Sequence, residues 1–567
     1  MKNKIFSLSV TALVLTLVCR PVWAQSNISA DLTNAINSTG GSSGITNGVM
    51  QTAGSSSSAT SNLVDIIVQY QTAPTAAEYA EITKLGGTIE RQYGAVTAAH
   101  YSVPKTAVTT LAQDANVSYM SLNRAVKGML NITAQAVYSN IANTQYGLTG
   151  AGIGIALVDS GIVSMPDFGP GSNSRIVYSQ NFVGGNATDQ FGHGTHVAGI
   201  LGANFPGGKY IGIAPGANLI NLRALDQNGA GTDDTVIAAI DEAIQLHRAG
   251  KYNLRVINLS LGRPVLEPAR FDPLCQAVEQ AWRAGIVVVV AAGNDGRDNS
   301  EGENGYGTIN SPGNDPYAIT VGAMKTEGTP TRTDDLIASY SSKGPTLYDH
   351  YVKPDLVAPG NLVVSTLPPG LTLSNEYPQN TVTGKYFMLS GTSMATPVVS
   401  GAAALLLQQN PTWNPDQVKA RLMETATKNF PVSSVAVDPT TGISYTSYYD
   451  TFTVGAGYLD IYAAITGTNV ASGSAVSPYV TLTSVNANEI SLSVNNVSAV
   501  NAIWGSNAIW GSNAIWGSNA IWGSNAIWGS NAIWGSNAIW GSNAIWGSNA
   551  IWGCSIEAAA MVPNPEN

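Results

Sequence analysis

The sequence predicts an α/β protein with a mostly parallel sheet that carries helices on both faces. Runs of nearly pure apolar residues recur along the middle of the chain, at 154–158, 256–259 and 286–292. Stretches with helical spacing, such as 235–246 and 273–284, separate them. Strands buried on both faces form continuous apolar runs, and their alternation with helices is typical of parallel neighbours.

Length and charge limit the classes of function. The chain has 567 residues, enough for two to four structural units. Its net charge of −10 argues against nucleic acid as a partner, because nucleic-acid binding needs a basic face. Two cysteines follow the first 24 residues, and Cys275 and Cys554 either pair after export or stay free.

The first residues are typical of an export signal. Lys2 and Lys4 precede an apolar stretch at 5–18, and Val22-Trp23-Ala24 offers a small-residue cleavage site. We therefore expect a signal peptide at 1–24 and a secreted or extracellular protein, with the periplasm or the cell surface as further locations. A spanning helix and a lipid anchor at Cys19 are alternatives, and we expect no transmembrane segment in the mature chain.

A small module precedes the main domain. Residues 25–61 are rich in Ser, Gly, Asn and Thr and are expected to form a flexible leader. Residues 62–127 follow the order βαββαβ, with strands at 63–70, 88–93, 99–103 and 117–122 and helices at 75–85 and 105–113. This order predicts a compact α+β module of ferredoxin-like topology, which by itself implies no activity.

Three polar residues in the main domain, 128–466, stand where strands end or helices begin. Asp159 closes an apolar strand, His193 stands at the mouth of a helix, and Ser393 follows the turn residue Gly391 at the start of another. In one parallel sheet such ends share an edge, so the three side chains can converge. A serine needs a histidine to take its proton, and the histidine needs a buried carboxylate to orient it. Asn294 offers an amide donor for an oxyanion, beside the backbone N–H of Ser393.

Other interpretations of these residues remain. Ser393 alone is also consistent with a plain helix N-cap. His193 and His196 could form half of a metal site, although no third ligand follows a recognisable pattern, and we expect no metal there. Glycines at 150, 152 and 154 suggest a dinucleotide loop, but they precede the strand instead of following it.

Five motifs in order, VDSGI, GHGTHVAGI, NLSLG, AAGND and GTSMATP, resemble those of the subtilisin-like serine proteases. The resemblance covers residues 62–465 and implies a subtilisin-like fold, peptide-bond hydrolysis through an acyl-enzyme, and protein or peptide substrates. It makes Asp159 the orienting acid, His193 the general base and acid, Ser393 the nucleophile and Asn294 the oxyanion donor. It also assigns substrate binding to Ser260, Leu261, Gly262, Ala292 and Gly293.

The same resemblance implies an autoprocessed precursor. The βαββαβ module corresponds to a pro-segment that inhibits its own protease domain, and we expect the cut between Arg124 and Gln135. No cofactor is expected, and calcium stays open, because the loop 203–210 carries Lys209 and few carboxylates. Asn310 falls near the floor of the primary specificity pocket, and Asp233-Asp234 either favours basic substrates or is a solvated helix start.

The chain ends in an unusual tail. Residues 467–500 predict a short β connector, and 501–553 repeat Asn-Ala-Ile-Trp-Gly-Ser nine times. Six is an even period, so on a strand every Ile faces one side and every Trp the other, which favours a β-type repeat tail. A low-complexity tail that packs loosely, a surface-attachment or self-association module and an aromatic ligand-binding face are the alternatives. Residues 554–567 form the C-terminal tail.

The leading interpretation is a secreted serine endopeptidase made as an inhibited precursor. The alternative is a surface adhesion or binding protein with a vestigial protease domain, in which the tryptophan-repeat tail carries the function. Another serine hydrolase, such as an esterase, is disfavoured because Ser393 does not sit in a Gly-x-Ser-x-Gly turn.

Overall fold

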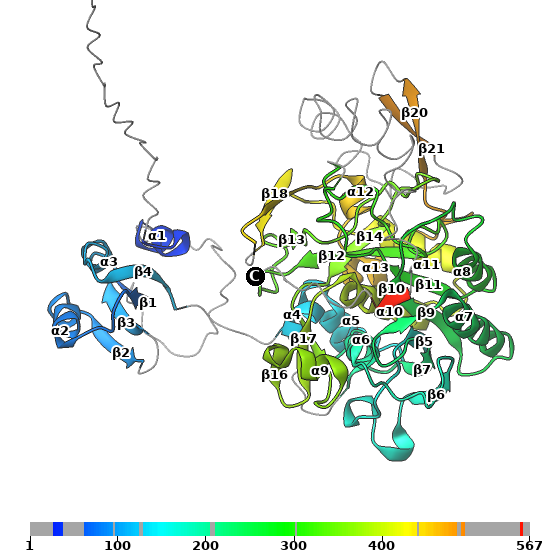
Figure 1. Ribbon diagram of the computed structural model, residues 1–567, viewed down its shortest axis with the longest axis horizontal. Helices are drawn as coiled ribbons and strands as arrows, with labels where there is room; N and C mark the ends of the chain where they lie inside the picture. Colours follow the sequence, from blue (N-terminus) through cyan, green and yellow to red (C-terminus); the bar gives the residue numbers. More distant parts are fainter. Residues whose placement is uncertain are drawn as a thin grey trace, which may run out of the picture. The chain divides into compact units, whose positions relative to one another are not determined.

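The computed structural model describes residues 27–37, 62–93, 97–123, 129–204, 210–300, 303–438, 441–484, 489–493 and 556–558. The chain forms two compact units (Figure 1), and the boundary between them falls between Val126 and Lys127. The expected signal peptide, the tryptophan repeats and Cys554 lie outside the described residues. No helix in the described ranges has the length and hydropathy needed to cross a membrane.

The N-terminal unit is a four-stranded antiparallel sheet of order β2-β3-β1-β4 with two helices in its connections. Its elements are β1 Leu63–Tyr70, α2 Ala76–Lys84, β2 Thr88–Gln92, β3 Ala98–Pro104, α3 Ala107–Leu111 and β4 Val117–Leu122. The expected order βαββαβ is therefore confirmed. The even positions of β1 are buried and the odd positions are mostly exposed, as a sheet with one packed face requires.

The expected flexible leader is wrong for residues 27–37. Helix α1, Ala30–Asn37, packs on this unit, and Ile28 forms a β-bridge with Met120. Leu32 is fully buried in the same core, and Ile28 and Ile36 are packed against it. Leu32 and Ile36 lie one turn apart on α1, whereas Ile28 precedes the helix, and the polar composition around them conceals this spacing.

The larger unit is built on an eight-stranded sheet of order β13-β12-β11-β9-β5-β7-β6, with β14 paired to β12. Every pairing is parallel except that of β13 with β12, so the sheet is mixed and mostly parallel, as predicted. The strands are β5 Gly154–Asp159, β6 Ile176–Asn181, β7 Asn218–Arg223, β9 Leu254–Leu259, β11 Val287–Ala291, β12 Ile319–Lys325, β13 Leu336–Ile337 and β14 Leu356–Pro359.

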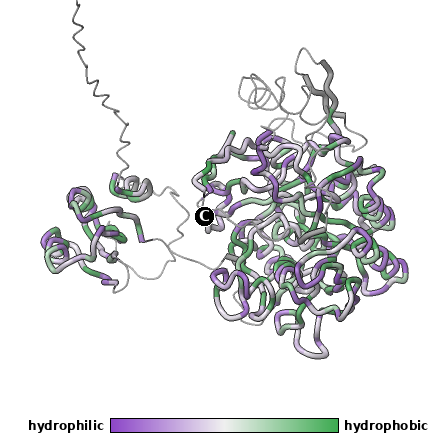
Figure 2. Tube along the Cα trace, in the orientation of Figure 1, coloured by the Kyte–Doolittle hydropathy of each residue, from purple (hydrophilic) through white to green (hydrophobic). Residues whose placement is uncertain are grey.

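Helices cover both faces of this sheet (Figure 1). Helices α6, His193–Gly202, and α10, Thr392–Gln409, pack together, and α7, Asp233–Arg248, packs on α8, Pro273–Arg283. In Figure 2 hydrophilic stretches lie largely along the periphery of this unit, outside the apolar core. The remaining helical segments are α4 Met129–Ala136, α5 Ser139–Gln145, η1 Pro166–Phe168, η2 Gly171–Asn173, α9 Thr372–Glu376, η3 Pro378–Asn380, α11 Pro415–Thr425, α12 Thr451–Val454 and α13 Ile461–Thr466.

Smaller sheets complete the unit. Strands β15 Val363–Thr366, β17 Tyr386–Leu389 and β16 Thr381–Thr383 form one, and β18 Ser433–Val437 pairs with β19 Ser444–Tyr448. The predicted β connector contains a hairpin of β20, Tyr479–Ser484, and β21, Glu489–Ser493. Its first residues are not a separate domain, however, because Ala475 and Val480 are buried in the core of the larger unit.

The C-terminal tail also contributes a strand. Strand β22, Ile556–Ala558, lies between β8, Ala230–Gly231, and β10, Leu261–Gly262, and is antiparallel to both. The sequence did not predict this pairing, because three residues are too few to show a strand period.

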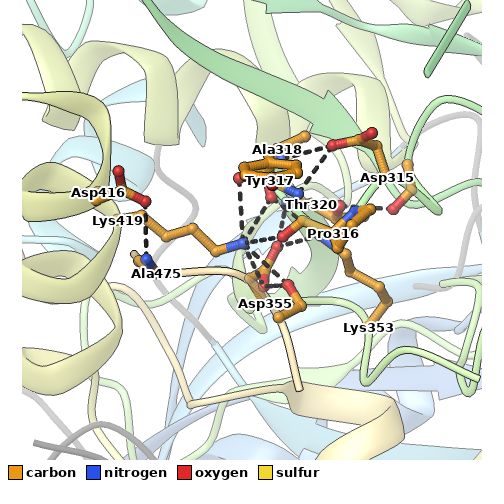
Figure 3. Close-up of polar contacts among 12 residues, drawn as sticks. Asp315, Pro316, Tyr317, Ala318, Thr320, Lys353, Asp355, Asp416, Lys419 and Ala475 are labelled. Atoms are coloured by element: carbon orange, nitrogen blue, oxygen red, sulfur yellow. Dashed lines mark hydrogen bonds and ion pairs between the residues drawn. The ribbon is translucent and has the colours of Figure 1, made fainter. Parts of the chain in front are cut away.

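A buried ionic cluster ties β14 to α11 and to the segment before the hairpin (Figure 3). The carboxylate of Asp355 pairs with Lys353 at 2.7 Å and with Lys419 at 3.1 Å, and all three side chains are fully buried. Lys419 Nζ also donates to the carbonyl oxygens of residues 316–318. Burial lowers the pKa of Lys419 to about 7 and raises the pKa of the nearby Asp315 to about 7. Burial alone would raise the pKa of Asp355, but the two ammonium groups outweigh it and hold this pKa below its usual value.

Candidate active site

The predicted site residues gather at one edge of the large sheet. Asp159 is the last residue of β5, Ser260 directly follows β9, and Asn294 comes shortly after β11. Helix α6 begins at His193, and Ser393 is the second residue of α10. Because β9, β5 and β11 are parallel and β9 lies between the other two, their carboxyl ends are adjacent.

Asp159 and His193 form a buried hydrogen-bonded pair. His193 Nδ1 donates to Asp159 Oδ1 at 2.7 Å, and both side chains are at most 1% exposed. The same oxygen accepts the backbone N–H of Ser160 at 2.7 Å. The close approach needs glycine at 194, where a Cβ would stand 2.2 Å from the carbonyl oxygen of Gly161. The acid therefore fixes the Nδ1–H tautomer and leaves Nε2 as the acceptor.

A second buried aspartate, Asp189, organises the start of α6. Its carboxylate accepts hydrogen bonds from the side chains of Ser160 and Thr195 and from the backbone N–H groups of Phe191, Gly192 and Thr195. Ser160 Oγ in turn accepts the N–H of Gly194 at 2.9 Å. Burial raises the pKa of Asp189, although hydrogen bonds from Thr195, Gly192 and Ser160 oppose this effect. Sequence reasoning missed this residue, because nothing in the motif around it distinguishes it from a loop aspartate.

Ser393 is held beside Ser260. Its Oγ donates to the Ser260 carbonyl oxygen at 3.0 Å, and Ser260 Oγ donates to the Ser393 carbonyl oxygen at 2.9 Å. The N-cap of α10 is Gly391, with φ of 155°, so the alternative that Ser393 is the N-cap is wrong. Within the described part of the chain, His193 Nε2 has no hydrogen-bond partner. The structure thus joins His193 to Asp159 but shows no bond between His193 and Ser393.

Two further buried side chains, Asn258 and Ser400, position the side chain of Ser260. Asn258 Nδ2 donates to Ser260 Oγ at 3.0 Å, and Ser400 Oγ donates to Asn258 Oδ1 at 2.8 Å. This buried chain of hydrogen bonds connects β9 to the third turn of α10. The sequence placed Ser260 on a substrate strand but gave no sign of its bond to Ser393.

Asn294 is oriented by the first residue of α10. Its Oδ1 accepts the N–H of Thr392 at 2.9 Å and the hydroxyl of Thr392 at 3.2 Å. Because Oδ1 faces Thr392, the NH₂ of the same planar amide group points away from Thr392. Gly293 adopts φ of 111° and donates its N–H to Thr392 Oγ1, so the turn after β11 is tied to the same helix start.

The expected substrate-binding residues lie around this point. Leu261 is fully buried. A Cβ atom added to Gly262 would stand 3.1 Å from the Cβ of Asn310. Asn310 donates its backbone N–H to the Ala292 carbonyl, and the Gly293 carbonyl accepts the N–H of Ser342. Asn310 therefore lies between Gly262 and the turn after β11, and its place at the floor of a specificity pocket stays a prediction.

Other predicted candidates have different surroundings. His196 Nε2 donates to the Phe387 carbonyl at 3.0 Å, and burial lowers the pKa of His196 to about 3, so this ring is neutral and serves packing. Asp233 makes a two-point ion pair with Arg263 at 2.8 and 3.0 Å. Asp233 and Asp234 both stand in the first turn of α7, as the helix-start interpretation requires, and a preference for basic substrates stays a prediction. Cys275 is a free, fully buried thiol.

Metal binding has little support in the described residues. No group of three or more His, Cys, Asp or Glu side chains is placed to hold an ion among them. Most of the candidate calcium loop, residues 205–209, lies outside the described ranges, so calcium stays an open expectation.

Comparison with known proteins places the site in a family. The sequence model of the subtilase family (peptidase S8) matches residues 150–443. The chain is 38% identical over 327 residues to serine protease AprX of Bacillus subtilis, covering 56% of this chain and 71% of that protein. It is 34% identical over 386 residues to subtilisin E of the same species, covering 66% and 88%. An extracellular serine proteinase of a Thermus species is 35% identical over 357 residues, covering 61% and 74%.

Proposed function

The chain belongs to the subtilase family and is a serine-type endopeptidase, and from this premise we propose that Ser393 is its nucleophile, His193 its general base and Asp159 the acid that orients the histidine. The buried 2.7 Å bond between His193 and Asp159, at the sheet edge where Ser393 begins its helix, carries this proposal. The alternative of a vestigial protease domain is not favoured, because all three side chains are present.

The catalytic cycle follows from these positions. The Ser393 hydroxyl turns from the Ser260 carbonyl to His193 Nε2, whose acceptor lone pair has no other partner among the described residues. His193 takes the proton while Oγ attacks the scissile carbonyl, and Asp159 stabilises the imidazolium that forms. The imidazolium then protonates the leaving amine, which departs from the acyl-enzyme. Water, deprotonated by the same histidine, releases the acid and restores the serine.

Labelling of the nucleophile tests this proposal. We expect the processed protein to cleave casein, and an alkyl fluorophosphonate to stop cleavage with one adduct per chain. Mass mapping should place the adduct on Ser393, since only an activated serine reacts quickly with such a reagent. An adduct on another serine, or casein cleavage that survives complete labelling of Ser393, contradicts the assignment.

Asn294 is proposed to donate to the oxyanion, together with the backbone N–H of Ser393. Asn294→Ala should lower kcat about 10²- to 10³-fold with little change in KM, the size known for the corresponding asparagine of subtilisin itself. Asn294→Asp is the matched variant, because it keeps an oxygen for the Thr392 N–H but replaces the donor. It should be as inactive as the alanine variant, and recovery of activity in it would reduce Asn294 to a support for α10.

We further propose that the enzyme is exported and made as a precursor. The N-terminal unit, Val126 and before, would act as its intramolecular inhibitor, as the resemblance implies, and protein or peptide chains are its substrates. Helix α4 spans Met129–Ala136 and Ile132 is buried, so a cut within the expected window of 124–135 falls most readily at 124–128. We expect no cofactor, and calcium binding stays open. The expected signal at 1–24 would export the protein, and its destination is the medium, the periplasm or the cell surface.

A further inference from the structure

The C-terminal strand β22 lies between two strands that border the proposed site, all within the larger unit. It is antiparallel to β10 on one side and to β8 on the other. The register pairs Leu261 with Ala558, Gly262 with Glu557, Ala230 with Glu557 and Gly231 with Ile556. Figure 1 shows this strand in red beside the β10 label, next to β9 and α10. A segment more than 150 residues from the catalytic serine in sequence thus returns to the catalytic edge of the sheet.

The direction of β22 points its carboxyl end at the nucleophile. Strand β10 starts directly after Ser260, whose carbonyl oxygen holds the Ser393 hydroxyl at 3.0 Å. Since Leu261 faces Ala558 and the strands are antiparallel, Ala558, the carboxyl end of β22, is the end of this strand nearer to Ser260. A peptide bound for cleavage must present its acyl side to the serine in this same direction.

Strands β8 and β10 would recognise an extended peptide through its backbone. Among the described strands, β8 and β10 pair with nothing except β22, so without it both would present open edges facing a gap of one strand. A peptide that adds a strand to open edges gains main-chain hydrogen bonds on both sides, whatever its side chains. The place that β22 occupies is therefore one that an extended substrate would need, and the two cannot occupy it together.

We propose that the C-terminal segment is an intramolecular, substrate-like inhibitor of the active-site cleft. This proposal rests on the proposed peptidase function of the same site. Strand β22 and the catalytic serine belong to one chain, so the strand competes intramolecularly, at an effective concentration set by the intervening chain, even when its own affinity is modest. The N-terminal unit would act before processing, and β22 continues to restrain the cleft after it.

Kinetics of the processed protein test the inhibition. Deletion of 554–567 should lower KM for a short chromogenic peptide anilide about threefold to tenfold with kcat unchanged, because a tethered competitor scales KM alone. Glu557→Pro removes a strand N–H inside β22 and should act like the deletion. Glu566→Pro is the matched control, with the same change of residue and charge outside the strand, and should behave as the parent.

A disulfide trap tests occupancy without activity. In a Ser393→Ala chain with Cys554→Ser, paired substitutions Ala230→Cys and Glu557→Cys should oxidise to an intramolecular disulfide, because the two positions face each other across β8 and β22. Ala230→Cys with Glu566→Cys should oxidise at least tenfold more slowly. Equal trapping in both pairs, or KM unchanged by the deletion in an active enzyme, overturns the proposal. A trapped strand in the Ser393→Ala chain, together with a processed parent that keeps Ser393 and cleaves no peptide, would instead contradict the peptidase function and leave the occupancy standing.

Discussion

Ser393→Ala is expected to lower kcat for peptide hydrolysis by about 10⁶, the fall known for the catalytic serine of subtilisin itself. Without the hydroxyl there is no atom at this place to form the acyl-enzyme, so His193 and Asp159 have no proton to move. The remaining rate would come from substrate binding and oxyanion stabilisation alone. Steady-state hydrolysis of a peptide anilide and casein cleavage measure the effect, and the precursor should stay uncut.

The three residues should act as one unit. His193→Ala alone should be nearly as inactive as Ser393→Ala, and the double variant should fall no further than either, because the second residue has nothing left to assist. Thermal unfolding of Ser393→Ala serves as the control for folding, because a cooperative transition shows that the variant folds although its bond to the Ser260 carbonyl is lost. Additive losses, or self-processing that continues without Ser393, would show that another nucleophile does the chemistry.

The sequence could predict where the catalytic groups meet because their positions follow from local patterns. Asp159 closes an apolar run that folds as the buried strand β5, and His193 and Ser393 both follow glycines that start helices. The carboxyl ends of parallel strands in one sheet lie along the same edge, so the residues that follow these strands gather there. The βαββαβ order of the N-terminal unit was predictable for the same reason, since each element shows its own period.

The supporting contacts could not be predicted because they join residues with no local signal. The bonds of Asp189 reach Ser160 and the start of α6, and the bond between Ser260 and Ser393 joins positions 133 apart in sequence. Helix α1 was missed because Leu32 and Ile36, which pack it on the core, stand within a polar segment. Strand β22 is too short to have a period, and its pairing depends on open edges elsewhere in the fold.

The buried cluster around Asp355 leads to the largest predicted effect on stability. Asp355→Asn keeps the shape of the side chain but removes the carboxylate that pairs with both Lys353 and Lys419. An ammonium group left in a dry interior is costly, so we expect a loss of about 3–5 kcal/mol in the free energy of unfolding. Thermal and urea unfolding in the Ser393→Ala background, which prevents self-digestion, measure the loss.

The loss should depend on pH with a defined sign. The folded-state pKa of Lys419 is already about 7, below its unfolded value of 10.5, so the folded protein binds fewer protons at this group between these values. Its contribution to stability therefore increases as pH rises from about 7 to 10.5. Without Asp355 the lysine gives up its proton still more readily, so the variant should recover part of its stability between pH 6 and 9. Glu279→Gln, which breaks the surface pair with Arg283, is the control and should cost under about 1 kcal/mol at every pH. A loss of that small size in Asp355→Asn would mean that the two lysines find other partners or water when the carboxylate is gone.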